Sequence, residues 1–157
     1  MKTTLIAIGR TNEPYWQSAI DEYSRRLRRY SPFEFLEIPD LKNTRALTEQ
    51  QIRDAEGENI LRLLNADDYV VLLDDKGRQY TSLQFADWLQ TRMSASLKRL
   101  VFVIGGPYGF SPSVYARAAH KLSLSTLTFS HQIVRPLFLE QLYRAHTILR
   151  NEPYHHE

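Results

Sequence analysis

A glycine-rich segment directly follows one of the most apolar runs of this 157-residue chain. Residues 100–104 have the composition of a buried strand, and the chain then reads Gly105-Gly106-Pro107-Tyr108-Gly109. Because glycine carries no Cβ, a turn of this kind lets a ligand approach the backbone closely. The G-x-G-x-x-G spacing of dinucleotide sites is absent, and no Gly-Lys-Ser/Thr follows as in phosphate-binding loops. The alternative is a tight strand-to-helix turn that binds nothing.

A second candidate binding segment covers residues 122–132, where hydroxyl and apolar side chains alternate before His131. A loop of this composition offers many backbone hydrogen-bonding groups and few charges. It therefore suits a ligand with an adenine edge and ribose hydroxyls. The alternative is an edge strand with one solvated face, which the same alternation fits.

The C-terminus reads Asn151-Glu152-Pro153-Tyr154-His155-His156-Glu157. Adjacent histidines point in different directions in any regular backbone, so they make a weak metal signal and we expect no metal site. A terminal tail is commonly disordered. The functional alternative is that the tyrosine and histidine side chains stack on an unpaired base and contact phosphate.

Four arginines cluster in the first third of the chain, as Arg25-Arg26 and Arg28-Arg29. The simplest interpretation is a solvated helix face. The functional interpretation is contact with an RNA backbone, for which the planar guanidinium is well suited. No serine lies in a nucleophile-elbow motif, and no His-Glu pair has helical metal-binding spacing, so hydrolase chemistry has no support.

Short apolar runs alternate with longer amphipathic segments along the chain. We expect helices over residues 15–29, 48–64, 82–93 and 135–151, plus one that Ser111 caps and Pro112 begins. Thr48 and Gln51 form a capping-box pattern, Ser82 is the expected cap of the third helix, and a turn is expected at Lys76 and Gly77. The expected strands cover residues 3–8, 33–38, 69–74, 100–104 and 121–124.

This alternation predicts an α/β fold, with a parallel sheet covered by helices on both faces. Ligands of such sheets bind beyond the carboxyl ends of the strands. Here those ends are Leu73-Asp74, Ile104-Gly105-Gly106 and the segment after Leu124. The sequence therefore places the binding site before any relationship to other proteins is considered.

Length and composition are those of one ordinary domain, which we expect to span residues 1–157. The chain has no cysteine, so a disulfide scaffold and cysteine-based zinc sites are excluded. No apolar stretch approaches the roughly 20 residues of a membrane span, and the N-terminal run is too short for a signal peptide. We therefore expect a cytoplasmic protein without a membrane partner. A net charge of +2 permits an RNA partner without requiring one.

With these residues in view, the chain resembles the SPOUT class of α/β-knot RNA methyltransferases. Within that class it is similar to the ribosomal RNA large subunit methyltransferase H family, and the similarity runs from Leu5 to His155. Four ordered segments carry it: Phe102-Val103-Ile104-Gly105-Gly106-Pro107-Tyr108-Gly109; residues 122–131; Glu140-Gln141-Leu142-Tyr143-Arg144-Ala145; and Pro153-Tyr154-His155.

The resemblance implies a C-terminal trefoil knot, which pattern reasoning alone would not propose because true knots are almost absent from proteins. It implies transfer of a methyl group from S-adenosylmethionine to N3 of a pseudouridine in 23S ribosomal RNA, with the assembled ribosome as the expected substrate. It also implies a homodimer in which RNA contacts come partly from the second subunit. The implied cofactor contacts are Leu73, Gly105, Leu124, Ser125, Thr126, Leu127, Thr128 and Phe129.

The expected RNA contacts are Arg25, Arg29, Arg135, Tyr154, His155 and His156. Family members commonly carry arginine or lysine where this chain has His156, which weakens the expected hold on phosphate because histidine is only fractionally charged at neutral pH. The N3 proton must leave during the reaction, and the candidate general bases are His155 and a bound water.

Two other functions remain open from the sequence. One is an RNA-binding or ribosome-associated module without catalysis, which would lack affinity for S-adenosylmethionine. The other is a nucleotide-dependent oxidoreductase on a doubly wound sheet. The missing glycine fingerprint and the missing acidic ribose partner argue against the oxidoreductase.

Overall fold

The computed structural model describes residues 1–156, and Glu157, the last residue of the expected domain, lies outside the described residues. The strands are β1 (Lys2–Ile8), β2 (Phe33–Ile38), β3 (Tyr69–Arg78), β4 (Arg99–Ile104) and β5 (His120–Leu122). The helices are α1 (Pro14–Leu27), α2 (Glu49–Arg62), α3 (Ser82–Met93), α4 (Pro112–Arg117) and α5 (Val134–Leu149), with a short 3₁₀ helix at Thr44–Ala46.

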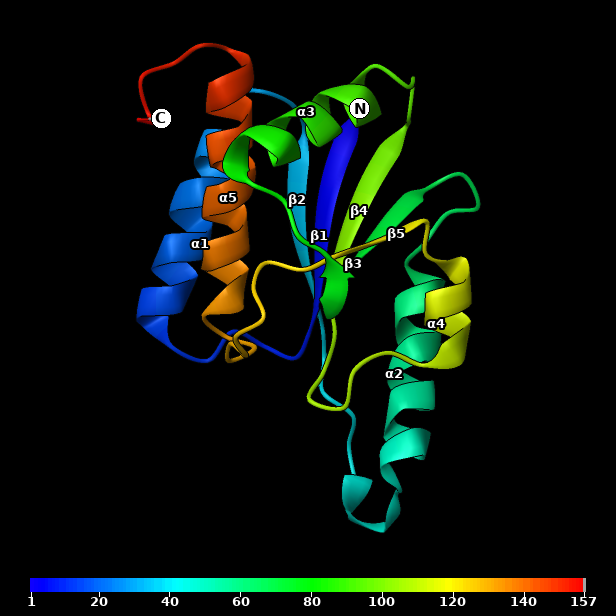
Figure 1. The fold of residues 1–157 in the computed structure, drawn as a ribbon. Coiled ribbons are helices and arrows are strands. Elements are labelled where there is room, and N and C mark those ends of the chain that lie inside the picture. The colour runs from blue at the N-terminus through cyan, green and yellow to red at the C-terminus, as the bar shows by residue number, and fades with distance from the viewer. Residues whose placement is uncertain (157) are drawn as a thin grey trace.

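The five strands form one sheet in the order β2-β1-β4-β3-β5, and every pair in it is parallel. Helices α1, α3 and α5 cover one face, and α2 and α4 cover the other (Figure 1). The predicted α/β fold is therefore confirmed, while the trefoil knot stays a prediction. No helix among the described residues combines the length and the apolar character that crossing a membrane requires.

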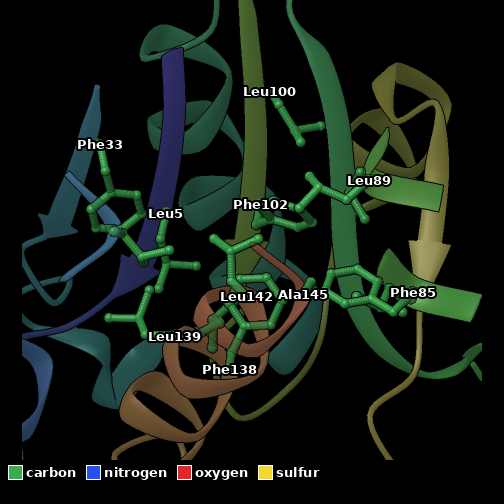
Figure 2. Packing of buried hydrophobic residues seen from close by; sticks show 14 of the residues in the cluster. Leu5, Phe33, Phe85, Leu89, Leu100, Phe102, Phe138, Leu139, Leu142 and Ala145 are labelled. Carbon is green, nitrogen blue, oxygen red and sulfur yellow. The ribbon is translucent and has the colours of Figure 1, made fainter. Parts of the chain in front are cut away.

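Alternate residues of the central strands point into two separate cores. Leu5 of β1 and Phe102 of β4 pair in register and pack with Phe138 and Leu139 of α5 (Figure 2). The neighbouring Ile6 points to the opposite face, into the cluster beneath α2 and α4. Because both faces are covered, β1 and β4 are almost continuously buried, as expected for central parallel strands.

Several element boundaries differ from the predicted ones. Strand β3 continues to Arg78 through the expected turn at Lys76 and Gly77. Helix α3 is capped by Thr81 rather than Ser82, because the Thr81 hydroxyl accepts from the Gln84 N–H at 3.1 Å and the Gln84 side chain accepts from the Thr81 N–H. The expected capping box at Thr48 and the Ser111 cap are confirmed.

Arg135 is the largest fully buried side chain, with no exposed area. Its guanidinium donates at 2.8–3.3 Å to the backbone oxygens of Ile8, Gly9 and His131 and to the side chains of Thr11 and Glu37. The expected RNA contact at Arg135 is therefore wrong, because neither its charge nor its donors reach the surface. Arg135 instead joins the start of α5 to the carboxyl end of β1.

His146 lies in the interface between α5 and α1, where its ring stacks on Tyr30 at a centroid distance of 4.9 Å. Tyr30 also donates to a carboxylate oxygen of Glu152 at 2.9 Å, so the same ring contacts the segment that follows α5. Burial lowers the pKa of His146 to about 4, and the nearby Arg150 charge adds to the effect. The imidazole is therefore neutral in the folded protein at pH 7.

We expect Arg135→Met to lower the free energy of unfolding by about 3–5 kcal/mol, because it leaves the buried carbonyl oxygens of Ile8 and Gly9 without this donor and removes the cation beside Glu37. Urea denaturation measures the change. The control is Arg62→Met, at an exposed arginine whose ion pair with Glu58 is 3.7 Å long, and it should stay within about 0.5 kcal/mol of the parent. A loss below 1 kcal/mol at Arg135 would contradict the anchoring role.

His146 should make the free energy of unfolding depend on pH between about 6.5 and 4. Between these pH values His146 is protonated in the unfolded chain but stays neutral in the folded protein. The stabilisation is therefore complete above pH 6.5 and is lost as the pH falls toward 4, by about 3 kcal/mol in total. His146→Phe keeps a ring against Tyr30 but cannot be protonated. It should therefore remove this contribution to the pH dependence of the free energy of unfolding, which denaturation curves at a series of pH values measure. If the free energy of unfolding of the variant depends on pH as in the parent, groups other than His146 cause that dependence.

Candidate functional site

A cavity of about 390 Å³ lies at the carboxyl ends of β3 and β4. It is bounded by the outer part of β3, by the loop that follows β4 and by the loop between β5 and α5. Seven of the eight expected cofactor contacts line it: Leu73, Gly105, Leu124, Ser125, Leu127, Thr128 and Phe129. Thr126 does not line the cavity. Two stretches that are separate in sequence, residues 104–110 and 122–131, thus border one space.

Gly105 occupies the floor of the cavity, where no larger residue fits without displacement. A Cβ at this position would lie 3.0 Å from the ring of Phe110, which is itself buried. Phe110 packs against the backbone here and closes the loop behind the cavity. The glycine is thus needed for close packing within the loop, and the cavity beside it stays open.

The loop between β5 and α5 is shaped by its own serines. Ser123 donates through its hydroxyl to the Ser125 carbonyl at 3.0 Å, and the Ser125 hydroxyl accepts from the Leu127 N–H at 3.0 Å. Ser130 accepts from the N–H of Ile133 at the start of α5. The extended-strand alternative is wrong beyond Ser123, whose N–H donates to the Arg78 carbonyl at 2.9 Å, because the following residues to 130 are bent and irregular and do not continue the ladder.

Two aspartates give one wall of the cavity negative charge. Asp74 accepts from the Tyr115 hydroxyl at 2.5 Å and from the Lys76 N–H at 2.9 Å, and Asp75 lies beside it. Burial alone would raise the pKa of Asp74, but these hydrogen bonds outweigh it and hold the pKa below its usual range. Burial and the same hydrogen bond raise the pKa of Tyr115 to about 12. The site therefore presents a carboxylate at neutral pH.

The sequence reasoning missed Asp75, Lys76 and Tyr115 as cavity residues. Lys76 was assigned to a turn and Asp75 to no element, although both follow the expected strand end closely. Tyr115 had no sequence signal, because it reaches Asp74 from α4, 41 residues along the chain. His131, which the sequence did single out, lines the cavity. Burial lowers its pKa, against a hydrogen bond with the Gly105 backbone, so its ring is neutral at pH 7.

The C-terminal tail folds back on α5 instead of lying free in solvent. The Tyr154 hydroxyl donates to Glu140 at 2.9 Å, and Arg144 lies over the Tyr154 ring at 4.8 Å. Arg144 also donates to Glu140 at 2.6 Å. The disordered-tail alternative is wrong for residues 151–156. None of these residues lines the cavity, so the structure does not bring Tyr154, His155 or His156 to the cavity of their own chain.

The orientation of His155 restricts its chemistry. Its Nδ1 lies 3.0 Å from Nη1 of Arg144. Arginine is always a donor, so Nδ1 must accept and the proton of the neutral ring lies on Nε2. In this arrangement Nε2 of His155 is a hydrogen-bond donor. A general base needs the opposite tautomer, so the geometry does not favour that role.

The expected basic contacts on α1 lie on the same side of the molecule as the tail. Arg25 is exposed and paired with Glu22, and Arg29 is exposed just beyond the end of α1. Arg26 lies over the ring of Tyr143, and Tyr143 packs edge-on against Tyr154. The arginine cluster and the tail are therefore parts of one continuous surface. Within residues 1–156, no three metal-ligating side chains come together.

Comparison with known proteins gives a consistent result over the full chain. A family model described as predicted SPOUT methyltransferase matches residues 1–155. The chain is 56% identical over 157 residues to ribosomal RNA large subunit methyltransferase H of Parabacteroides distasonis, and the alignment covers 100% of both chains. It is 55% identical over 156 residues to the protein of that name from Christiangramia forsetii, with 99% of each chain covered. The identity is 51% over 157 residues, again 100% of both chains, for the one from Phocaeicola vulgatus.

Tyr115→Phe should raise the pKa of Asp74. Burial raises the pKa of this carboxyl and is the largest influence on it. The variant removes one of the hydrogen bonds that lower the pKa. A carbon-13 carboxyl titration by NMR measures the change, with Tyr108→Phe on another part of the cavity wall as the control. An Asp74 pKa that stays the same or falls would show that the Tyr115 hydroxyl does not hold the charge.

Proposed function

Because the chain belongs to the SPOUT methyltransferase family, we propose that it transfers a methyl group from S-adenosylmethionine to N3 of a pseudouridine in 23S ribosomal RNA. The observation that carries the proposal is the cavity in which the loops after β4 and β5 meet. The relatives that are 51–56% identical over the full chain are named for the large-subunit ribosomal RNA that they methylate, which supports this substrate.

The cavity suits S-adenosylmethionine in size and charge. About 390 Å³ falls within the range of roughly 300–1,000 Å³ that is typical of cofactor sites. The backbone groups of the loop over residues 124–129 offer donors and acceptors for an adenine and a ribose. Asp74 and Asp75 place negative charge next to a ligand that carries a sulfonium and an ammonium. When bound, this cofactor supplies a methyl group that is already activated for transfer.

The protein's own task is mainly to align the target base, because proximity and orientation supply most of the rate for an activated methyl group. The base must leave its stack, or lie in a loop, to reach the cavity. The N3 proton passes to water in this proposal. His155 acts through Nε2 as a hydrogen-bond donor that orients the base, held in that tautomer by Arg144.

The position of the tail supports a homodimer with a shared site. Val134 borders the cavity, whereas Arg144, which holds His155, lies ten residues further along α5. At 1.5 Å per residue this is about 15 Å along the helix. His155 therefore serves the cavity of a second copy of the chain in this proposal, and it brings Tyr154, His156 and the arginines of α1 with it as RNA contacts.

We place the protein in the cytoplasm, where ribosomal RNA is found, and propose the assembled ribosome as the substrate. The proposal predicts that calorimetry detects S-adenosylmethionine binding and that Gly105→Val, which drives a side chain into Phe110 and the cavity, weakens it at least tenfold. Circular dichroism melts check that the variant folds. A parent protein without affinity for S-adenosylmethionine would instead support the RNA-binding module without catalysis.

Mixing two inactive variants tests the shared site. Gly105→Val keeps an intact tail, and His155→Ala keeps an intact cavity. In a randomly mixed dimer population, about half the molecules are heterodimers with one complete site, so the methyl-transfer rate should recover to about a quarter of the parent rate. No recovery would mean that the tail does not serve a partner's cavity. Full activity of His155→Ala alone would exclude any role of this ring in catalysis.

A further inference from the structure

A second hollow, of about 710 Å³, lies along the open edge of the sheet at β5. The outer part of β3, strand β5 and the end of α4 form its walls. Its polar side chains are mostly basic. The residues that line it are Asp74, Lys76, Gly77, Arg78, Tyr115, Ala118, Ala119, His120 and Lys121.

The positive charge of this groove is exposed and is not neutralised within it. Lys76, Arg78 and Lys121 are exposed, and Asp74 is the one carboxylate among the lining residues. That carboxylate already accepts from Tyr115 and from the Lys76 backbone. Three cations against one occupied carboxylate leave a net charge of +2, which suits a partner with repeated negative charges.

Gly77 makes this arrangement possible. A Cβ on Gly77 would lie 2.6 Å from the carbonyl carbon of Lys121, so β3 approaches β5 more closely than any other residue would allow. The pairing register also shifts between Leu73 and Arg78. This irregular crossing keeps Arg78 and Lys121 at the same sheet edge, where Arg78 lies over the ring of Tyr80 and Lys121 over the ring of Tyr115.

The groove is continuous with the candidate cofactor cavity. Asp74, Lys76 and Tyr115 line both spaces. Tyr115 keeps 40% of its surface exposed at the junction, and Lys121 lies 5.7 Å from the centre of its ring. An exposed aromatic ring beside a cation is a combination that proteins use to hold single-stranded nucleic acid, through base stacking and backbone contact.

We propose that the β5-edge groove, defined by Arg78, Tyr115 and Lys121, binds the phosphate backbone of the RNA strand next to the target nucleotide. This inference rests on the proposed function and extends it, because it adds an RNA contact on the chain that supplies the cavity. A strand in the groove leads into the cavity past Tyr115. The tail and the α1 arginines lie at the other end of the molecule (Figure 1), so the groove is a separate contact from the one expected there.

The test is the double variant Arg78→Gln/Lys121→Gln, because neither residue lines the cofactor cavity. Methyl transfer is measured on ribosomes that lack the modification, and binding is measured by fluorescence anisotropy of labelled protein over a series of salt concentrations. We expect KM for ribosomes to rise about tenfold and kcat to change less than twofold, since phosphate contacts position the RNA. The slope of log K against log salt should become shallower by about 1.4, from two lost contacts at about 0.7 each. The Kd for S-adenosylmethionine should stay unchanged.

The matched control is Lys42→Gln/Lys98→Gln, which removes the same charge at two exposed lysines outside the groove. It should leave KM and the salt slope at parent values. The double variant Arg78→Lys/Lys121→Arg keeps both charges and should retain the parent KM. If the Arg78→Gln/Lys121→Gln protein has the KM and the salt slope of the parent, RNA does not bind in the groove and the proposal is overturned. If the parent protein binds ribosomes but transfers no methyl group, the proposed function is overturned instead. The salt dependence of its ribosome binding, compared with that of the double variant, then still tests whether RNA binds in the groove.

Discussion

The parallel pairing of β3 with both β4 and β5 is the constraint on which the rest of the structure depends. Parallel strands end at the same edge of a sheet, so the segments that leave β3, β4 and β5 must meet there. The glycine-rich loop, the serine-braced loop and the two aspartates therefore border one cavity although they are spread over residues 74–131 of the chain. The helices that cover both faces keep water from these strands, and the edge stays the accessible place for a ligand.

Holding two irregular loops at a sheet edge requires a rigid support, which Arg135 provides. Three of its five hydrogen bonds satisfy backbone oxygens, those of Ile8 and Gly9 at the end of β1 and that of His131, which lines the cavity. A buried arginine is costly to desolvate, so it stabilises the fold only because every contact is made at once. The same residue thus links the stability of the core to the position of the loop between β5 and α5.

Charge is distributed over the molecule in a way that matches the two proposed ligands. Carboxylates line the cavity that would hold a cationic methyl donor, and cations line the neighbouring groove that would hold phosphates. Tyr115 belongs to both, since its hydroxyl holds the charge of Asp74 while its ring faces the groove. At the other end of α5, Arg144 fixes both Tyr154 and His155, so the tail is a formed surface before any RNA arrives.

The sequence by itself determined the α/β class, the carboxyl-edge location of the site and most of the cavity wall. Apolar periodicity reports how each element is buried, and capping patterns such as Thr48–Gln51 are local enough to be predicted. Tertiary structure alone decided that Arg135 is buried, that His155 faces Arg144 with its accepting nitrogen, and that Gly77 lies against the backbone of Lys121. Each of these depends on which side chain or strand lies opposite: His155 contacts Arg144, 11 residues away, and Arg135 donates to Ile8, 127 residues away. Local patterns do not encode such partners, because the same arginine suits a solvated surface or a buried network equally well until the fold supplies its acceptors.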